Sequence, residues 1–576
     1  MIQIAHNPTH AKVLNAPKNA LLEVHRLLSY RVEGSEHMAA FKSGGWDGRS
    51  SFFSFDKQTF PTGFVRLVVR GLKKLGHEVQ IVAKPAPEPL GPVNPTVDAF
   101  GYNARYDYQP EAVEQLVRHK NITVQIATGG GKSRVARMAM KRIDRPTLFL
   151  TTRGILMHQM HRAIEEMEGT PCAILGDGEW GIPYTRADGS EGRKISKFTV
   201  GMVQTLAQRL EKKTVEQEMQ ALKDRRDAEI ARKLDAERKA LLKKKVPIVE
   251  IGSRLLALSE EISKKHGSLE AERPKVVAKV AKHEKLRTAT EDILARFELV
   301  IVEEAHEVSS NSFYAVMGAC KNAHYRMALT GTPFMKDDEE ANMRLLASCG
   351  PVAIKISEQM LIDRGILARP YFKYIAMPEA SRPKRLFRST PWQVAYECGI
   401  VENHYRNKAI CAELLRGMRW GLNAMVLVQH KAHGEILKEM LTKAGVRVDF
   451  IYGEDNQKAR DKALQALGTG TLDVLIGSTI LDVGVDVPSV GMIVLAGGGK
   501  AEVATRQRIG RGLREKKGGV PNVAFIVDVA DDMNNHLRGH YLQRRQIVQS
   551  TPGFAENIVS DFNFAALGLR RVAEAA

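Results

Sequence analysis

The segment Ala127 to Ser133, ATGGGKS, has the residue types that a phosphate-binding loop requires. Its glycines allow backbone N–H groups to turn towards phosphate oxygens, and the helix expected after them adds the positive end of its dipole. Lys132 is expected to hold the β- and γ-phosphates of ATP, and Ser133 to ligate Mg²⁺. The strict pattern has glycine at position 126, where this chain has Ile126, so the motif alone leaves a chance glycine-rich turn open.

Two adjacent carboxylates, Glu303 and Glu304, follow the apolar run Leu299–Val302. At the carboxyl end of a strand they fit the second half of a nucleotide site. Glu303 is expected to hold Mg²⁺ through water, and Glu304 to polarise the attacking water. The alternative is an acidic helix cap.

A basic run lies near the end of the chain, RQRIGRGLR from Arg506 to Arg514. Arg511 and Arg514 are three residues apart, which predicts that they share one helical face. Arginines that close over a nucleotide neutralise charge on the transferred phosphoryl group. A basic surface without such a role is the alternative.

Two series of short apolar runs alternate with helical stretches and predict the elements that position these residues. The first series comprises residues 123–127, 147–151, 198–202, 299–302 and 326–329. The second comprises residues 424–428, 448–452, 474–477, 492–496 and 523–527. This rhythm predicts an α/β chain with two tandem parallel-sheet lobes.

The chain divides by composition into four parts. Residues 1–84 predict a small α+β domain for substrate recognition, with helices over 17–30 and 64–75 and a hairpin through Asp47-Gly48. Residues 85–100 are a proline-rich linker. Lobe one is expected over 101–355 and lobe two over 356–576. Within lobe one, residues 207–295 predict a basic helical insertion, broken at Pro247, Gly267 and Pro274, which is either passive or a lever for nucleic acid or a partner.

The 576 residues carry a net charge of +19, which points to a polyanionic partner such as nucleic acid. No apolar run approaches the ~20 residues that a membrane span needs, so no membrane partner is expected. The five scattered cysteines form no CxxC pair and indicate reduced thiols in a cytoplasm.

The ordered set of motifs resembles that of superfamily-two helicases, whose two RecA-like lobes the resemblance also implies. Tyr108-Gln109 resembles the motif that reads adenine, Thr128 to Ser133 the phosphate loop with Gly129, Gly130 and Gly131, and Glu303 to His306 a DEAH-type motif. Thr330 to Thr332 resembles the motif that couples hydrolysis to movement, and His306 would link it to the ATP site. Gly484 and Asp486 resemble a nucleotide-binding motif of lobe two, and Gln507, Arg511 and Arg514 the catalytic motif of that lobe.

The same resemblance places nucleic-acid contacts at Thr152, Arg153, Gln204, Thr205 and Thr479. The N-terminal GWDGR and FPTGF segments and the HKAHG segment at 430–434 resemble the phage recombination branch of these helicases. Trp46 and Arg49 are then candidates for stacking on exposed bases, although Trp46 packed in a small core is the simpler interpretation. Glu303 departs from the aspartate usual at its position, and the 207–295 insertion has no counterpart in that branch.

This resemblance implies an ATP- and Mg²⁺-dependent DNA helicase acting on branched DNA. The expected reactions are junction migration, fork regression and opening of D-loops or RNA–DNA hybrids. It also implies a monomer in a bacterial or phage-infected host cytoplasm, with recombination or single-strand-binding proteins as partners. A duplex translocase that does not separate strands, an RNA helicase and a DNA-binding scaffold with an inactive ATPase are the alternatives.

Overall fold

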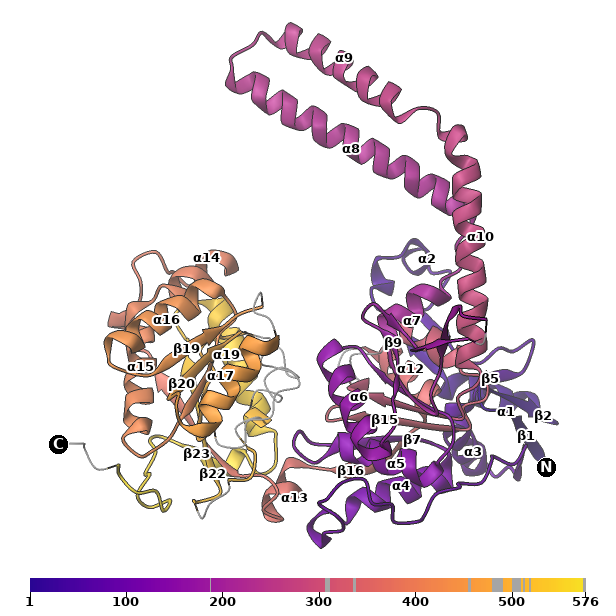
Figure 1. Cartoon of the computed structure of the whole chain (residues 1–576), viewed down its shortest axis with the longest axis horizontal. Coiled ribbons are helices and arrows are strands. Elements are labelled where there is room, and N and C mark those ends of the chain that lie inside the picture. Colours follow the sequence, from indigo (N-terminus) through magenta and orange to yellow (C-terminus); the bar gives the residue numbers. More distant parts are fainter. Residues whose placement is uncertain are drawn as a thin grey trace.

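The computed structural model shows two α/β lobes side by side, a small N-terminal unit on lobe one, and a long helical arm (Figure 1). It describes residues 1–572 except 187, 306–310, 335–337, 454–456, 479–489, 500–508, 511–512 and 517–519. No helix in these described ranges is long and apolar enough to cross a membrane.

The N-terminal unit, residues 1–84, is a mixed sheet with strand order β5-β2-β1-β6. Its strands are β1 (Ile2–His6), β2 (His10–Leu14), β5 (Thr59–Pro61) and β6 (Val79–Ala83), and its helices are α1 (Lys18–Leu27), α2 (Ala39–Lys42) and α3 (Val65–Lys74). The predicted hairpin through Asp47-Gly48 is wrong. β4 (Arg49–Ser51) pairs with the earlier strand β3 (Ser29–Arg31), so the two strands are joined by a 17-residue connection that contains α2 instead of by a tight turn.

This unit is docked on lobe one along helix α12 (Glu339–Cys349). Gly63 lies so close to it that an added Cβ would be 2.0 Å from the carbonyl oxygen of Leu346. The Tyr30 hydroxyl donates to Glu340, and the Arg31 amide donates to Glu339. The following proline-rich stretch has no helix or strand and runs along lobe one, where the Pro87 carbonyl accepts from the Tyr325 hydroxyl.

Lobe one contains an eight-stranded sheet in the order β10-β9-β13-β8-β14-β15-β7-β16, parallel except at β10. Its strands are β7 (Asn121–Ile126), β8 (Thr147–Thr151), β9 (Ala173–Gly176), β10 (Glu179–Trp180), β13 (Phe198–Met202), β14 (Leu299–Glu303), β15 (Tyr325–Thr330) and β16 (Val352–Ile356). Helices α4 (Tyr108–His119), α5 (Lys132–Ile143), α6 (Gly154–Glu168), α7 (Val203–Leu210), α11 (Asn311–Ala319) and α12 complete it, with a separate hairpin, β11 (Ile182–Thr185) and β12 (Glu191–Lys194). All five predicted strands are present.

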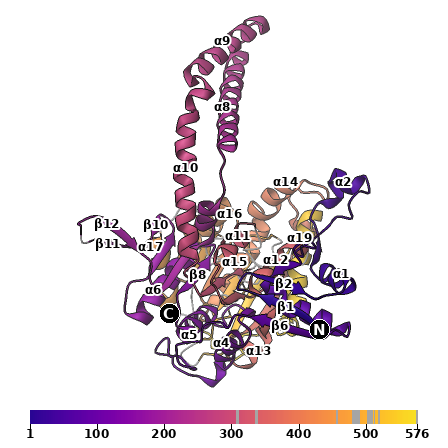
Figure 2. The same ribbon diagram turned by 90° about the vertical axis from the view of Figure 1, so that its right-hand side faces the viewer.

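The arm grows out of lobe one directly after α7 and returns into β14. It consists of α8 (Val215–Lys243), α9 (Ile248–His266) and α10 (Leu269–Leu294), and it projects far beyond the lobe (Figures 1 and 2). The expected breaks at Pro247 and Gly267 are confirmed, whereas Pro274 lies inside α10. Lys279 pairs with Glu218 across α10 and α8, and the tip exposes Ile248 and Val249.

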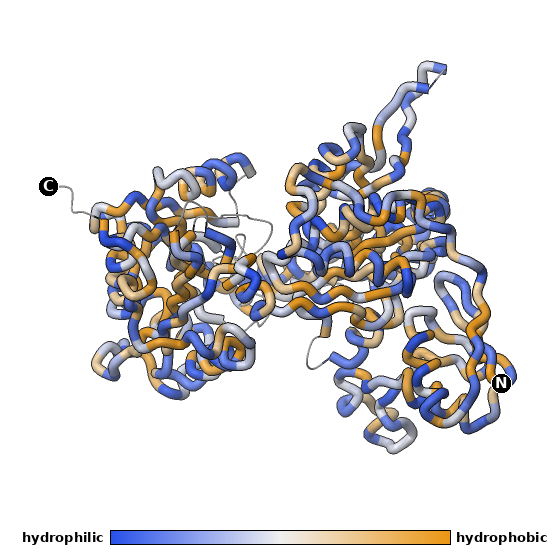
Figure 3. The backbone as a smooth tube through the Cα atoms, turned by 90° about the horizontal axis from the view of Figure 1, so that it is seen from below, coloured by the Kyte–Doolittle hydropathy of each residue, from blue (hydrophilic) through white to orange (hydrophobic). Residues whose placement is uncertain are grey.

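Lobe two contains a fully parallel seven-stranded sheet in the order β19-β20-β18-β21-β22-β17-β23. Its strands are β17 (Arg369–Ala376), β18 (Ala424–Leu427), β19 (Val448–Ile451), β20 (Val474–Gly477), β21 (Met492–Val494), β22 (Val523–Ala530) and β23 (Ile558–Val559). Its helices are α14 (Trp392–Tyr396), continued by a π-helical turn (Glu397–Val401), α15 (His404–Met418), α16 (Lys431–Lys443), α17 (Gln457–Thr469) and α19 (Asn535–Gln549). In both lobes the apolar residues lie along the central strands, which explains why apolar runs predicted them (Figure 3).

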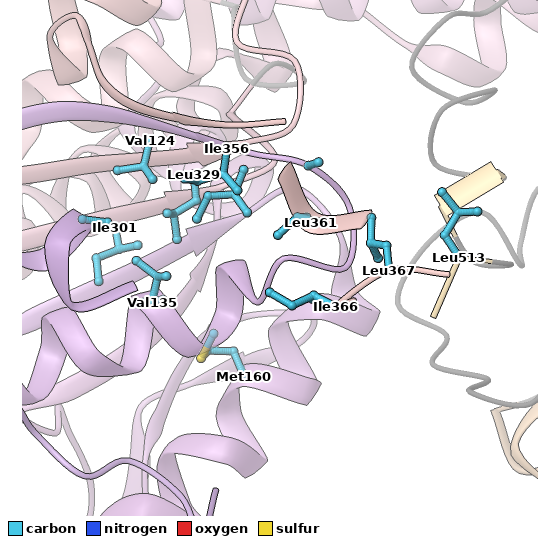
Figure 4. Close-up of a cluster of buried hydrophobic side chains, with 14 of the residues drawn as sticks. Val124, Val135, Met160, Ile301, Leu329, Ile356, Leu361, Ile366, Leu367 and Leu513 are labelled. Carbon is cyan, nitrogen blue, oxygen red and sulfur yellow. The ribbon is translucent and has the colours of Figure 1, made fainter. Parts of the chain in front are cut away.

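A short apolar bridge joins the two lobes (Figure 4). It begins at Leu361 on α13 (Glu358–Asp363), continues through Ile366 and Leu367, and reaches Leu513 of lobe two. The Ala368 amide donates to the Leu513 carbonyl at 2.7 Å. This bridge fixes one end of the seam between the lobes, next to the glycine-rich loop.

Candidate active site at the seam between the lobes

The glycine-rich loop lies between β7 and α5, as the sequence predicts. Gly129 and Gly131 have φ values of 91° and 84°, in the left-handed region that favours glycine. A Cβ on Gly131 would also lie 2.4 Å from Nε2 of Gln109. Ile126, the departure from the strict motif, is the last residue of the strand, and its side chain packs beneath Gly130. The loop therefore has the compact glycine-dependent form that brings backbone N–H groups to a phosphate.

Tyr108 and Gln109 support this loop from below. The Tyr108 hydroxyl and the Gln109 amide both donate to the Gly130 carbonyl, at 2.7 and 3.2 Å. Gln109 Oε1 in turn accepts from Arg134 at 2.7 Å. Both residues are buried, and burial raises the pKa of the Tyr108 phenol well above its usual range. In this structure they hold the phosphate loop, while their predicted contact with adenine stays a prediction.

Lys132, Ser133, Glu303 and Glu304 converge at the carboxyl ends of β7 and β14. The Ser133 hydroxyl donates to Glu303 Oε1 at 3.2 Å, and Lys132 Nζ lies 3.7 Å from Glu304 Oε1. Glu303 is buried, and this burial, with the neighbouring Glu304 as the second cause, raises the pKa of its carboxyl to about 7. A buried carboxylate beside a hydroxyl is a suitable donor pair for a small, hard divalent cation. The residues present therefore fit Mg²⁺ with a nucleotide triphosphate.

Glu304 has an unusual backbone. Its φ is 50°, in the left-handed region that a non-glycine residue seldom occupies. Such a conformation costs on the order of 1–3 kcal/mol and is found mostly at functional sites. It turns the chain sharply at the end of β14, so that two consecutive carboxylates reach the same site.

Thr330 and Thr332 lie at the end of the neighbouring strand, β15. The Thr332 amide donates to the Thr330 hydroxyl, and the Gln125 amide donates to the Gly331 carbonyl at 3.2 Å. This turn is therefore attached to β7, the strand that leads into the phosphate loop. That arrangement suits the coupling role assigned to these threonines.

Lobe two contacts the phosphate loop through its predicted catalytic motif. A Cβ on Gly510 would lie 2.8 Å from the Thr128 side chain, and Leu367 packs on Gly129. The expectation that Arg511 and Arg514 share a helical face is wrong at Arg514, because Arg514 forms an antiparallel β-bridge with Leu367. This bridge places Arg514 at the apolar connection between the lobes.

Several predicted site residues lie outside the described residues, namely His306, Thr479, Gly484, Asp486, Gln507 and Arg511. Their roles stay predictions.

The predicted nucleic-acid contacts of lobe one lie side by side. Thr152 and Arg153 follow β8, Gln204 and Thr205 begin α7, and the Gln204 amide donates to the Thr152 carbonyl at 3.0 Å. Beside them is an open cleft of about 830 Å³, lined mainly by α6, with Asp461 of lobe two also on its wall. The four residues thus lie together at the carboxyl edge of the lobe-one sheet, directly before or at the start of α6 and α7.

Arg49 lies away from this group. Its guanidinium donates to the Ser29 carbonyl at 3.1 Å and lies 3.6 Å from Glu339 of lobe one. The Trp46 indole donates to the Arg49 carbonyl at 2.6 Å. Only the pair with Glu339 reaches lobe one, and the other two contacts lie within the N-terminal unit, so base stacking by Arg49 stays a prediction.

The sequence did not predict one network beside the phosphate loop. Asp98 of the proline-rich stretch pairs with Arg134 and Arg137 of α5, and Arg134 stacks on Phe100. The only signal in the sequence was the presence of two arginines, three residues apart on a predicted helix, and of one aspartate in the linker. This network ties the linker to the first turns of the phosphate-loop helix.

Comparison with known proteins agrees with this geometry. Residues 104–335 match the family described as type III restriction enzyme, res subunit, and residues 406–516 match the helicase conserved C-terminal domain. The ATP-dependent DNA helicase uvsW of Enterobacteria phage T4 is 21% identical over 241 residues, 41% of this chain and 46% of the relative. The DNA 3'-5' translocase XPB2 of Sulfurisphaera tokodaii is 25% identical over 262 residues, 40% of this chain and 58% of the relative.

The chain spans about half the length of the relatives it matches. The crystal structure of T4 UvsW aligns with 97% of this chain and 98% of its own, with 15% identity and a TM-score of 0.38. The two family matches fall on the two lobes, and each includes motifs that meet at the seam. The matched parts of the chain, residues 104–335 and 406–516, are therefore similar to the two ATPase lobes of superfamily-two helicases.

Proposed function

We propose that this protein is an ATP-dependent DNA helicase or translocase that acts on branched DNA. The observation that supports the ATPase part is the convergence of Lys132, Ser133, Glu303 and Glu304 in lobe one. Gly510 of lobe two lies against the same glycine-rich loop. A nucleotide in this seam would be touched by both lobes. Its turnover could then change how the lobes sit, which is what a motor requires.

Each residue of the seam has a distinct part in this proposal. Bound MgATP supplies the phosphoryl group and the charge that polarises it. Ser133 and Glu303 would hold the metal, and Lys132 with the loop amides would hold the phosphates. Glu304 would orient and deprotonate the attacking water, and lobe-two arginines would stabilise the charge that develops.

DNA is the proposed track because the relatives that carry a substrate in their names are DNA helicases or translocases. Thr152, Arg153, Gln204 and Thr205 would hold the strand mainly by its phosphates, which implies weak sequence preference. The N-terminal unit and the arm would select branched structures such as forks, junctions, D-loops or RNA–DNA hybrids. Recombination and repair are the processes in which such substrates arise.

A duplex translocase without strand separation is the second candidate, since the relative from S. tokodaii is named a translocase. An RNA helicase is a third, and a strand-displacement assay on DNA and RNA duplexes separates the three.

The first test is ATP hydrolysis by the wild type, by Glu304→Gln and by Glu435→Gln, an exposed control on α16. Each is assayed alone and with single-stranded, duplex, forked or four-way-junction DNA. We expect the greatest stimulation by branched DNA and a loss of about 10²–10⁴-fold in Glu304→Gln only, because general-base catalysis contributes about that factor. Equal stimulation by plain duplex would favour the translocase. Hydrolysis that no nucleic acid stimulates would contradict the motor.

A further inference from the structure

A short basic and aromatic loop in lobe two has no role in the site described above. Residues 382–388, RPKRLFR, carry four cationic side chains and no acidic one. Arg382, Lys384, Arg385, Phe387 and Arg388 are exposed, and Phe387 is 60% exposed. Arg382 pairs with Glu379 and Arg388 with Asp532. In the described part of the chain, no ion pair is found for Lys384 or Arg385.

The exposure of Phe387 is fixed by a rigid support. The neighbouring Leu386 is 1% exposed and packs with Tyr396, Ile400 and Leu537. The buried amide of Asn534 donates to the carbonyls of Phe387, Arg388 and Thr390. The Phe387 amide donates to the Thr390 hydroxyl at 2.8 Å. The loop thus buries Leu386 and holds the Phe387 ring exposed to solvent among the cationic side chains.

This support stands over the carboxyl ends of the lobe-two strands. Tyr396 on α14 contacts the His430 ring after β18, and its hydroxyl donates to the Gly497 carbonyl after β21. Asn534 follows β22. In parallel sheets this edge carries the ligand-binding loops, and lobe one presents Thr152 and Gln204 from the corresponding edge.

The figures place the loop on the side of the molecule where the arm is rooted. α14, which follows the loop directly, lies at the upper end of lobe two, and the arm rises from the upper end of lobe one in both views (Figures 1 and 2). Single-stranded nucleic acid is bound by grooves in which cations track the phosphates and aromatic rings stack on bases. Both components are present here within seven residues.

We propose that residues 382–388 form a binding site for single-stranded DNA, in which Phe387 stacks on a base and Lys384 and Arg385 contact phosphates. This inference rests on the proposed DNA motor and adds a lobe-two contact that the helicase motifs do not include. A stacking ring on one lobe would hold the strand while the other lobe moves.

The test uses the full chain and a fluorescein-labelled oligothymidylate, with binding measured by anisotropy over a range of salt concentrations. The variants are Phe387→Ala, Phe387→Tyr and the double variant Lys384→Ala/Arg385→Ala. The control is Leu542→Ala, which also removes an exposed apolar side chain from lobe two. Leu542 lies on α19 about 200° around the helix from His540, the residue that contacts Trp392 of α14, so it is on the opposite face from α14. All variants change exposed side chains, and unfolding curves check that each is folded.

We expect Phe387→Ala to weaken binding about tenfold, or about 1.4 kcal/mol, with an unchanged salt slope, because the variant loses the stack on a base but no phosphate contact. The double variant should lower the magnitude of the salt slope by about 1.4, or about 0.7 for each lost phosphate contact. Phe387→Tyr and Leu542→Ala should bind like the wild type. With 2-aminopurine in the strand, stacking should quench its fluorescence in the wild type and in Phe387→Tyr, but not in Phe387→Ala.

Two failures are distinguishable. If the wild type binds the oligonucleotide and hydrolyses ATP, but Phe387→Ala and the double variant bind equally well, the loop has no such role and the proposed motor stands. If the wild type binds no DNA, both the loop assignment and the proposed function are wrong.

Discussion

Gly131 combines two constraints at one residue. Its φ of 84° disfavours any side chain, and a Cβ there would overlap the Gln109 amide that supports the loop. We expect Gly131→Ala to bind a fluorescent ATP analogue at least about tenfold more weakly, because left-handed backbone costs alanine about 1–2 kcal/mol before any overlap is relieved. Gly318→Ala, in α11 with open space around it, should bind normally. Equal affinities would show that the loop tolerates a side chain.

His433 illustrates a different constraint, because it is buried in lobe two. Burial, with Arg406 and His430 as lesser causes, lowers the pKa of its imidazole to about 3, and its Nε2 lies 2.9 Å from Asn407 Oδ1. In the unfolded chain His433 has its ordinary pKa near 6.5 and binds a proton below that pH, whereas in the folded chain it binds this proton only below about pH 3. Stability should therefore fall as pH drops through that window, by about 2 kcal/mol at pH 5 for this group alone.

Urea unfolding at about pH 7.5 and pH 5 measures this effect. His433→Gln keeps an amide donor near Asn407 and does not titrate. The wild type should lose about 2 kcal/mol more than this variant between the two pH values. Equal losses would place the titration in other groups.

At the scale of elements, Gly63 sets how the N-terminal unit is seated. A Gly63→Ala substitution would put a methyl group 2.0 Å from the carbonyl oxygen of Leu346 in α12 and 2.5 Å from that of Ala347. Overpacking of this kind costs about 1–3 kcal/mol, and here it should push the unit away from lobe one. We expect a lower unfolding temperature and faster tryptic cleavage between the unit and lobe one. Gly45→Ala, whose Cβ would have only ordinary contacts, is the matched control and should behave like the wild type.

The elements also show what could be predicted from the sequence. Parallel strands buried on both faces are apolar runs, so ten of them could be predicted. β9 was missed because its buried run has only four residues, and β16 and β17 were missed because lysines and half-exposed residues interrupt their sequences. The pairing of β4 with β3 and the left-handed Glu304 backbone depend on contacts and backbone angles that residue types do not specify. The P-loop and both carboxylates were predicted because their motifs are local, whereas the loop at 382–388 matches no motif.

At the scale of the whole molecule, the arm can be removed with its root kept. The root is marked by His283, whose ring nitrogen lies 2.8 Å from the Glu211 carbonyl oxygen, and both residues are kept in this design. Replacing residues 212–282 with a short glycine–serine linker therefore retains the part of α10 that packs on α7, including buried Thr290 and Leu294.

We expect this deletion to leave DNA-free ATP hydrolysis unchanged and to weaken binding to forked DNA, with a smaller salt slope because cationic contacts are lost. Anisotropy with forked and single-stranded DNA measures both quantities. Unchanged affinity and slope for both DNAs would show that the arm is a passive insertion.

The arm and strand β14 are consecutive in the chain. α10 ends at Leu294, β14 begins at Leu299, and β14 ends at Glu303. A 26-residue helix is about 39 Å long, and the inner end of α10 is joined by four residues to the strand that ends at Glu303, the residue before Glu304. In the proposed motor, a load on the outer end of α10 would therefore reach the Glu303–Glu304 pair along a short stretch of backbone, so the arm would report an obstruction to the ATP site.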